Sequence, residues 1–298
     1  MLLEDYIRLE LGPDSGRIVS SIAEASFIVW EEIPRRKALL STFNPYGEKQ
    51  AELDVFADRL FRNSIIKTGQ AAEVVSEESG PVFSEGKIHV AMDPLDGSSN
   101  IETNNPVGSI FCLFTERLPC SGKYIACSLY ITYGPMLTLT ISSGKGVKRF
   151  VASRQDREYK YVLSEESLRI KEEGEVYSFG GQRRDWVEPV TAYVHRLEER
   201  GLKLRYSGTF VADFNQILKY GGIFGYPALK SKPKGKLRSV FEAIPVSYIA
   251  SEAGGYGSTG KQDILSVEPK SLSETTPVYV GSKPIVKELE SLLSWENT

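Results

Sequence analysis

The sequence has few of the side chains on which many enzyme classes depend. Its 298 residues include only two histidines, His89 and His195, and three cysteines, Cys112, Cys120 and Cys127. The cysteines show no paired spacing typical of a zinc site, and a zinc hydrolase or a Ser-His-Asp enzyme would need more histidine. Any metal is therefore expected to be a hard cation held by carboxylates. We interpret the thiols as reduced and partly buried, with a redox switch as the alternative.

Long apolar runs and an excess of positive charge are also missing. No run of about 18 or more apolar residues occurs, so no transmembrane helix is expected. Residues 1–5 have neither the basic nor the apolar region of a signal peptide, which predicts a cytoplasmic protein. The net charge of −3 argues against binding to nucleic acid. A hydrophobic content of 41% with 25% charged residues is that of an ordinary globular protein.

Apolar spacing predicts helices and strands in the first half of the chain. Apolar residues three and four apart predict helices over residues 15–30 and 48–66. The turn-rich segment 41–47 between them is expected to be a mobile loop. Runs rich in β-branched and aromatic residues predict strands over residues 88–92, 107–115, 124–133, 136–141 and 147–151. The short links between these strands indicate a mostly antiparallel sheet.

The second half alternates between helical and strand-like segments. Helices are predicted over residues 190–199, 211–220, 243–253 and 283–294, with extended segments at 203–206 and 221–226. We place a domain boundary near Gly174, which gives domains of residues 1–174 and 175–298. The predicted fold class is α/β, with helices and a mixed sheet first and a smaller α/β unit second.

An acidic motif follows directly on the strand predicted at residues 88–92. It reads Asp93-Pro94-Leu95-Asp96-Gly97-Ser98-Ser99-Asn100. Because Pro94 has no N–H group, the chain is expected to leave the sheet there. The carboxylates of Asp93 and Asp96 can then converge on one point with the Leu95 carbonyl. Oxygen ligands of this kind suit Mg²⁺.

The second part of the motif offers hydrogen-bond donors to an anion. Gly97, Ser98 and Ser99 supply backbone N–H groups and hydroxyls at an expected helix start, where a phosphate can be cradled. The competing interpretation is an Asp-Gly turn that caps a helix. That interpretation would suffice for an isolated Asp-Gly pair, but it is much weaker for the whole string.

Further acids lie outside this motif. Glu77 and Glu78 end another apolar run, and adjacent acids can divide two tasks between metal ligation and the polarisation of a water. Taken alone, the pair would be interpreted as a solvated face. Glu48 and Asp54 bracket the start of the second predicted helix, where favourable interaction with the helix dipole competes as an explanation. Glu242 follows a basic segment in an apolar context, and a carboxylate there requires a nearby cation.

Basic residues alternate along residues 230–238. A bare charge run of this kind would be a solvated loop, but Lys236 and Arg238 share one face of an extended chain. With Glu242 close behind, they could hold a phosphate beside a metal. Further candidates for contact with a second anionic group are Arg183, Arg184, Arg205, Tyr206 and Tyr226.

Taken together, these segments resemble the fructose-1,6-bisphosphatase family over most of the chain. The segments that carry the resemblance are residues 76–78, 93–100, 206–213, 220–224, 233–238 and 252–255. The Asp-Pro-Leu-Asp-Gly string alone is shared with the wider lithium-sensitive phosphatase superfamily, which includes inositol monophosphatases. The basic segment that ends at Arg238 narrows the resemblance to a sugar bisphosphatase.

The resemblance implies a layered α-β-α-β-α sugar-phosphatase fold and Mg²⁺-dependent hydrolysis of the 1-phosphate of fructose 1,6-bisphosphate. Two or three ions are implied per subunit, with Mn²⁺ as an alternative. The implied metal ligands are Glu77, Asp93, the Leu95 carbonyl, Asp96 and Glu242, with Glu48 on a loop that closes over the site. The residues implied in activating water are Asp54 and Glu78, with Glu77 beside them. Most metal ligands would thus lie in the first domain.

Substrate contacts are implied mainly in the second domain. The residues that would hold the sugar phosphate are Ser98 with its neighbours Gly97 and Ser99, and Lys236 and Arg238. Those implied at the distal phosphate are Arg205, Tyr206 and Tyr226. In the family the arginine at the Arg205 position comes from a neighbouring subunit, which implies a homo-oligomer, specifically a tetramer.

Four positions depart from the family pattern. Gly180 stands where the family has an asparagine for the distal phosphate, and Arg183 stands where it has a tyrosine. Arg183 could replace the lost contact with a charged one, and sedoheptulose 1,7-bisphosphate stays open as a substrate.

Ile88 and Thr115 replace a tyrosine and an arginine of AMP-sensitive members, and the segment before the first predicted helix is short. We therefore expect no inhibition by AMP.

Two other functions remain as alternatives. One is a catalytically inactive sensor that binds sugar phosphates, although no acid expected at the metal site is missing. The other is a phosphatase of inositol phosphates, which the basic segment at residues 230–238 disfavours.

Overall fold

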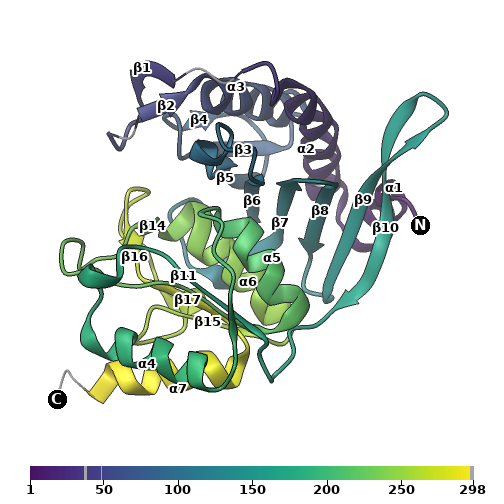
Figure 1. The fold of residues 1–298 in the computed structure, drawn as a ribbon. Coiled ribbons are helices and arrows are strands. Elements are labelled where there is room, and N and C mark those ends of the chain that lie inside the picture. Colours follow the sequence, from purple (N-terminus) through teal and green to yellow (C-terminus); the bar gives the residue numbers. More distant parts are fainter. Residues whose placement is uncertain (37–38, 48, 296–298) are drawn as a thin grey trace. The chain divides into compact units, whose positions relative to one another are not determined.

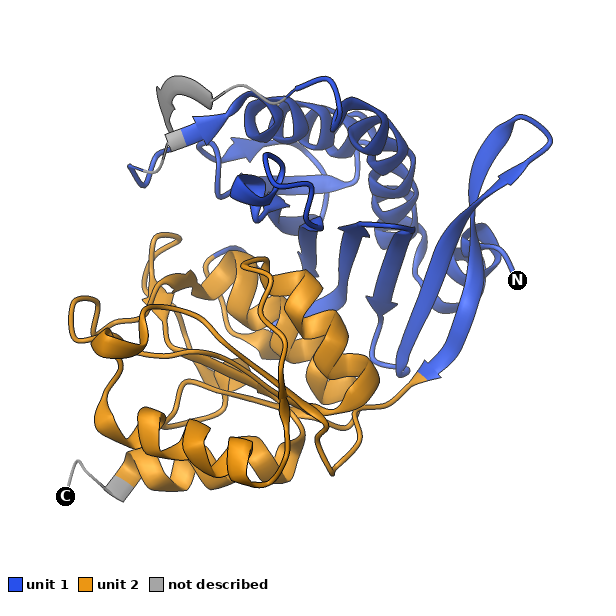
Figure 2. Cartoon of the chain, viewed as in Figure 1, with its two compact units in different colours: residues 1–118, 124–167 blue, residues 119–123, 168–298 orange. Residues whose placement is uncertain are grey.

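The computed structural model describes residues 1–36, 39–47 and 49–295. The chain divides into two compact units, drawn in blue and orange in Figure 2. The first comprises Met1–Leu118 and Tyr124–Ser167, and the second comprises Pro119–Lys123 and Leu168–Thr298. The division thus falls a few residues before Gly174. The first unit ends within strand β10 (Glu158–Leu168).

Three helices belong to the first unit: α1 (Leu3–Glu10), α2 (Pro13–Glu32) and α3 (Glu52–Lys67). The helix predicted at residues 15–30 is confirmed by α2, in which Pro13 takes the first helical position that its fixed φ favours. The helix predicted from residue 48 begins only at Glu52, because β1 (Leu39–Phe43) and β2 (Lys49–Ala51) form an antiparallel hairpin before it. The expected loop at residues 41–47 is therefore largely part of this hairpin.

An eight-stranded sheet forms the body of the first unit (Figure 1). Its order is β10-β9-β8-β7-β6-β5-β3-β4. The strands are β3 (Ala71–Ser76), β4 (Val82–Phe83), β5 (Ile88–Asp96), β6 (Val107–Phe114), β7 (Ile125–Tyr133), β8 (Leu137–Ser142), β9 (Val147–Gln155) and β10 (Glu158–Leu168). Strands β3 and β5 are parallel, whereas β5 to β9 pair antiparallel in succession as predicted.

The two faces of this sheet differ in their partners. Met92 of β5 lies opposite Phe111 of β6, and both belong to a buried apolar cluster with Phe61 and Ala57 of α3. Because side chains alternate along a strand, Ala91 and Asp93 lie on the other face. The helices of the unit thus cover one face, and the acidic residues of β5 occupy the opposite one.

The second unit is a three-layer α/β arrangement. Its five-stranded sheet has the order β12-β11-β13-β17-β15. The strands are β11 (Val176–Phe179), β12 (Lys203–Leu204), β13 (Gly222–Tyr226), β15 (Tyr256–Ser258) and β17 (Val278–Gly281), with a separate pair β14 (Leu237–Arg238) and β16 (Thr275–Thr276). The helices are α4 (Glu188–Glu199), α5 (Phe210–Tyr220), α6 (Ile244–Glu252) and α7 (Lys283–Trp295).

Side chains alternate along these strands, and helices pack against both faces of the sheet. Tyr177 and Ile223 pack with Tyr193 of α4 and Val286 of α7 in one buried cluster. On the other face, the ring of Phe224 lies 4.5 Å from that of Phe210 in α5. The helices predicted for the second half are confirmed, and each begins within two residues of its expected start.

The described residues contain no helix that is both long and apolar enough to cross a membrane. None of the three cysteines forms a disulfide, and Cys112 and Cys127 are buried in the sheet of the first unit.

Candidate active site

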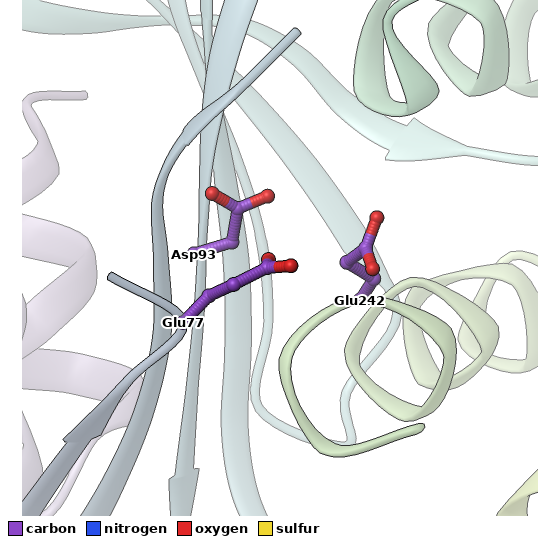
Figure 3. A group of neighbouring side chains, drawn as sticks. All are labelled: Glu77, Asp93 and Glu242. Atoms are coloured by element: carbon purple, nitrogen blue, oxygen red, sulfur yellow. The ribbon is translucent and has the colours of Figure 1, made fainter. Parts of the chain in front are cut away.

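Glu77 and Asp93 meet at the ends of two parallel strands. The Glu77 N–H group donates a hydrogen bond to the Met92 carbonyl, 3.1 Å away, which continues the β3–β5 register by one residue. Carboxylate oxygens of Glu77 and Asp93 consequently lie within 4.8 Å of each other. Their side chains are drawn in Figure 3 together with that of Glu242 from the second unit. Both acids are buried, with 9% and 5% exposure.

A β-bulge brings Asp96 to the same face as Asp93. In an unbroken strand, residues three apart point to opposite faces. Here Asp93 pairs with Ile110 and Asp96 with Gly108, so two residues of β5 oppose only Ser109 on β6. The extra residue restores both aspartates to one face. The Ser109 hydroxyl stabilises the bulge by donating to the Pro94 carbonyl at 2.7 Å.

The bulge also determines the orientation of the acidic motif. The Leu95 N–H group donates to Asp93 Oδ1 at 3.0 Å, which directs that carboxylate. The expected helix start after Asp96 is only a single 3₁₀ turn, Ser98–Asn100, entered through Gly97 in the left-handed region at φ 79°. Glycine adopts this conformation without the steric penalty of a side chain. Ser98 is half-buried and Ser99 exposed, so their hydroxyls can meet an anion from outside.

Asp54 is a buried acid at the start of α3. Its Oδ2 accepts the Ala51 N–H group at 2.6 Å, which caps the helix. Burial raises the pKa of Asp54 to about 6, against the lowering effect of hydrogen bonds from the Ala51 backbone and the Ser98 side chain. Its other oxygen, Oδ1, has no hydrogen-bond partner among the described residues. A buried carboxylate oxygen in this position is suited to accept from a bound water.

Glu78 is held by amide side chains of the β1–β2 hairpin. The Gln50 Nε2 atom donates to Glu78 Oε2 at 2.6 Å and to the Glu78 carbonyl at 3.2 Å. Burial is the main cause that raises the pKa of Glu78 to about 7. The charges of Asp54 and Asp58 act in the same direction, whereas hydrogen bonds from Gln50 and Asn44 lower it. A carboxyl group with this pKa is suited to take a proton near neutral pH.

A second network supports the turn that carries these acids. The Ser79 hydroxyl donates to Asp58 Oδ1 at 3.0 Å and accepts from the Arg62 guanidinium at 3.0 Å. Arg62 also pairs with Asp58 at 3.2 Å. Since Asp58 and Arg62 both lie on α3, the helix anchors the residue that follows Glu78.

Glu242 and Arg238 form the buried polar group of the second unit. A π-helical turn, Ser239–Ala243, joins β14 to α6 and carries Glu242. The Arg238 N–H group donates to Glu242 Oε2 at 2.6 Å. The Arg238 guanidinium donates to the Ser273 carbonyl at 3.3 Å. Both side chains are buried, at 7% and 8% exposure, and short π-helical turns are often found at functional sites.

Lys236 differs from Arg238 in being exposed. Its ammonium lies 5.6 Å from the centre of the Tyr226 ring, a separation compatible with a cation–π contact. The Tyr226 ring in turn packs against Gly180. A Cβ atom at Gly180 would lie 2.5 Å from Tyr226 Cε2 and 3.2 Å from the Tyr206 hydroxyl. The space of a side chain at position 180 is therefore filled by Tyr226.

The two arginines expected near a distal phosphate have different surroundings. Arg205 is exposed directly after β12, an edge strand, and its guanidinium donates to the Leu204 carbonyl at 3.0 Å. Arg183 is also exposed, but it contacts His195 Nε2 at 2.6 Å. Arg183 thus contacts α4, and its expected contact with the distal phosphate stays a prediction.

The sequence-predicted residues fall into two groups. The acids Asp54, Glu77, Glu78, Asp93 and Asp96 all belong to the first unit, at the ends of β3 and β5 and the start of α3. Lys236, Arg238, Glu242, Tyr206 and Tyr226 belong to the second. Glu48 lies outside the described residues. Gln50 was not predicted, because nothing in the sequence around it indicates its contact with Glu78.

Both units match models of one protein family. Residues 16–166 match the fructose-1-6-bisphosphatase N-terminal domain, and residues 170–294 match the corresponding C-terminal domain. A class 1 fructose-1,6-bisphosphatase of Methanocorpusculum labreanum is 38% identical over 294 residues, spanning 97% of this chain and 91% of that protein. One from Geobacter sulfurreducens is 40% identical over 272 residues, with 89% and 86% covered.

Solved structures agree with this assignment. The holo form of Leishmania major fructose-1,6-bisphosphatase has a TM-score of 0.93 at 26% identity, with 99% of each chain covered. The layered α/β fold expected from the sequence is thereby confirmed. The family resemblance is confirmed over both halves of the chain. The protein belongs to the fructose-1,6-bisphosphatase family.

Proposed function

We propose that this protein hydrolyses the 1-phosphate of fructose 1,6-bisphosphate, releasing fructose 6-phosphate and inorganic phosphate with the help of Mg²⁺. The observation that carries the proposal is the set of buried carboxylates that β3 and β5 bring to one face of the sheet, in a chain of this family. Buried carboxylates this close together are costly unless cations neutralise them. The relatives named above are called fructose-1,6-bisphosphatases, which points to the same substrate.

The residues present fit hard cations. Glu77, Asp93, Asp96 and the Leu95 carbonyl are all oxygen donors, the type that Mg²⁺ prefers, with Mn²⁺ as an alternative. We propose two or three ions per subunit, with Glu242 of the second unit as a further ligand. Bound there, the ions would neutralise phosphate charge and favour the ionisation of a water. Glu48 retains its proposed role as a ligand on a closing loop.

The chain's own acids would move the proton. Glu78, aided by Asp54, accepts a proton from a water whose oxygen attacks the phosphorus atom. As the new P–O bond forms, the bond from phosphorus to the sugar oxygen breaks, and that oxygen takes up a proton from solvent. Because Glu78 ionises near neutral pH, it can accept the proton and later return it to solvent.

The second unit would recognise the substrate. Arg238, which is buried beside Glu242, and the exposed Lys236 would pair with phosphate oxygens. Ser98 and the neighbouring Gly97 and Ser99 would add hydrogen bonds from the first unit. Tyr206, Tyr226 and Arg205 would contact the distal phosphate, with Arg205 supplied by a neighbouring subunit of a homotetramer. Its exposure at an edge strand is what such a contact needs.

We propose further that this protein acts in the cytoplasm, where cysteines without disulfide bonds are usual.

We also propose that AMP does not regulate this protein. Ile88 and Thr115 offer no phenol and no guanidinium to a nucleotide, and the Thr115 hydroxyl already donates to the Tyr124 carbonyl at 3.2 Å. Inhibition by AMP at low micromolar concentration would contradict this.

One experiment separates the candidate substrates. Phosphate release is measured with fructose 1,6-bisphosphate, sedoheptulose 1,7-bisphosphate and inositol 1-phosphate in parallel, with Mg²⁺ and with EDTA. We expect the highest kcat/KM with fructose 1,6-bisphosphate and none with EDTA. Preference for sedoheptulose 1,7-bisphosphate would correct the substrate. Binding of fructose 1,6-bisphosphate with no release of phosphate from any of the three would indicate a sensor instead.

A further inference from the structure

A buried glutamine connects the β1–β2 hairpin to Glu78. Gln50 lies on β2 and is only 7% exposed. Its Nε2 atom carries two hydrogens, and each has an acceptor, Glu78 Oε2 at 2.6 Å and the Glu78 carbonyl at 3.2 Å. The amide thus binds the side chain and the backbone of the same residue. Such a two-point contact restricts both the position of Glu78 and the rotation of its carboxylate.

The contact distinguishes the two oxygens of the carboxylate. Gln50 engages Oε2, so the two oxygens have different surroundings. Because Gln50 is neutral, it orients the carboxylate without pairing its charge as a lysine or arginine would. Asn44, at the other side of the same hairpin, also hydrogen-bonds to the Glu78 side chain. Two amides from one hairpin therefore hold one acid.

We propose that Gln50 is a positioning residue for the hydrolysis: by donating to both Oε2 and the carbonyl of Glu78, it fixes the direction in which this carboxylate meets the attacking water. The inference rests on the proposed function, in which Glu78 accepts the proton of that water. It adds that the orientation of Glu78 depends on the two hydrogen bonds from the Gln50 amide.

Two substitutions of equal length test the contact in the full chain. Gln50→Met keeps the volume but removes both donors, and Gln50→Glu replaces the donors by a second carboxylate. We expect Gln50→Met to lower kcat for fructose 1,6-bisphosphate about tenfold with KM changed less than about twofold, and Gln50→Glu to lower kcat further. The matched control is Gln70→Met. Gln70 directly precedes β3, at the end away from Glu78, and its Nε2 atom donates to the Thr68 carbonyl at 3.0 Å.

A double-mutant cycle tests whether Gln50 affects turnover through Glu78. If Gln50 acts through Glu78, adding Gln50→Met to Glu78→Gln causes no further loss of kcat. Amide hydrogen exchange gives a second readout without turnover: residues 49–51 should exchange faster in Gln50→Met and at the wild-type rate in Gln70→Met.

The outcomes separate this inference from the proposed function. Wild-type kcat in Gln50→Met, with Glu78→Gln inactive, would overturn the inference alone. A full additional loss in the double variant would do the same. Near-normal turnover of Glu78→Gln would overturn the assignment of the proton acceptor and the inference with it.

Discussion

The acidic residues of the first unit and the basic and aromatic residues of the second differ in how firmly they are held. Glu77, Asp93 and Asp96 are buried and take their positions from the backbone hydrogen bonds of a sheet. Lys236 and Tyr206 are exposed and come from loops. Metal binding and proton transfer depend on geometry within fractions of an ångström, whereas a flexible charge can still attract an anion. The first unit thus supplies buried acids, whereas the second supplies the exposed Lys236 and Tyr206 as well as the buried Arg238 and Glu242.

The largest effect on turnover is expected when one of the buried acids of the first unit is replaced. Asp93→Asn keeps the size of the side chain but removes the charge that a cation needs, so kcat should fall about a thousandfold. Mg²⁺ should raise the melting temperature of the wild type and much less that of the variant. The control is Asp156→Asn, at an exposed position of positive φ that asparagine tolerates well. Near-normal turnover of Asp93→Asn would contradict the proposed site.

A smaller effect, confined to binding, is expected in the second unit. Lys236→Met removes the ammonium beside Tyr226, so KM for fructose 1,6-bisphosphate should rise about ten- to thirtyfold while kcat changes less than about threefold. Lys234→Met is the control, because Lys234 is exposed on the same run. Equal effects of the two substitutions would mean that only the overall positive charge of the segment matters.

The pH dependence of stability tests burial in the first unit. The folded-state pKa values of Asp54 and Glu78, about 6 and about 7, lie above their ordinary values because of burial. The native state therefore holds their protons more tightly than the unfolded chain. This contribution is fully present below their ordinary pKa values, about 4, and is lost as pH rises through 6 and 7.

The measurement is urea unfolding of EDTA-treated protein at pH 5 and pH 8. The two groups should lower the free energy of unfolding at pH 8 by on the order of 3–4 kcal/mol relative to pH 5. Glu78→Gln should reduce the difference, because the glutamine does not titrate. An unchanged difference in that variant would show that other groups cause it.

The smallest effect is expected at Gly180. Gly180→Ala would place a methyl group against the Tyr226 ring and displace it, so KM should rise about threefold with kcat preserved. Gly122→Ala is the control, since its Cβ atom would meet the Leu265 side chain at 2.7 Å without touching Tyr206 or Tyr226. A change in kcat rather than KM would place the Tyr226 ring nearer to the chemistry than we propose.

Secondary structure was predictable where burial imposes a clear period. The helix α2 and the strands β6 to β9 were predicted because one or both of their faces are apolar. The helix α1 was missed, because eight residues with only Leu3 and Tyr6 buried give a weak signal. Strand β10 was missed because its charged residues imitate a linker.

The sequence by itself determined the family and the chemistry. The string from Asp93 to Asn100 places two acids and a set of donors within eight residues, and covalent linkage alone keeps such neighbours together. The basic segment that ends at Arg238 narrowed the family in the same way. The family could be identified from the sequence because each of these motifs lies within one short segment.

Only the tertiary structure decided which atoms meet. Asp93 and Asp96 share a face because a bulge against β6 adds one residue to β5, and Glu77 lies beside Asp93 because β3 pairs parallel with β5. Gln50 reaches Glu78 across 28 positions of the chain. Contacts of this kind depend on strand register and hairpin docking, which the whole fold selects and no short segment encodes.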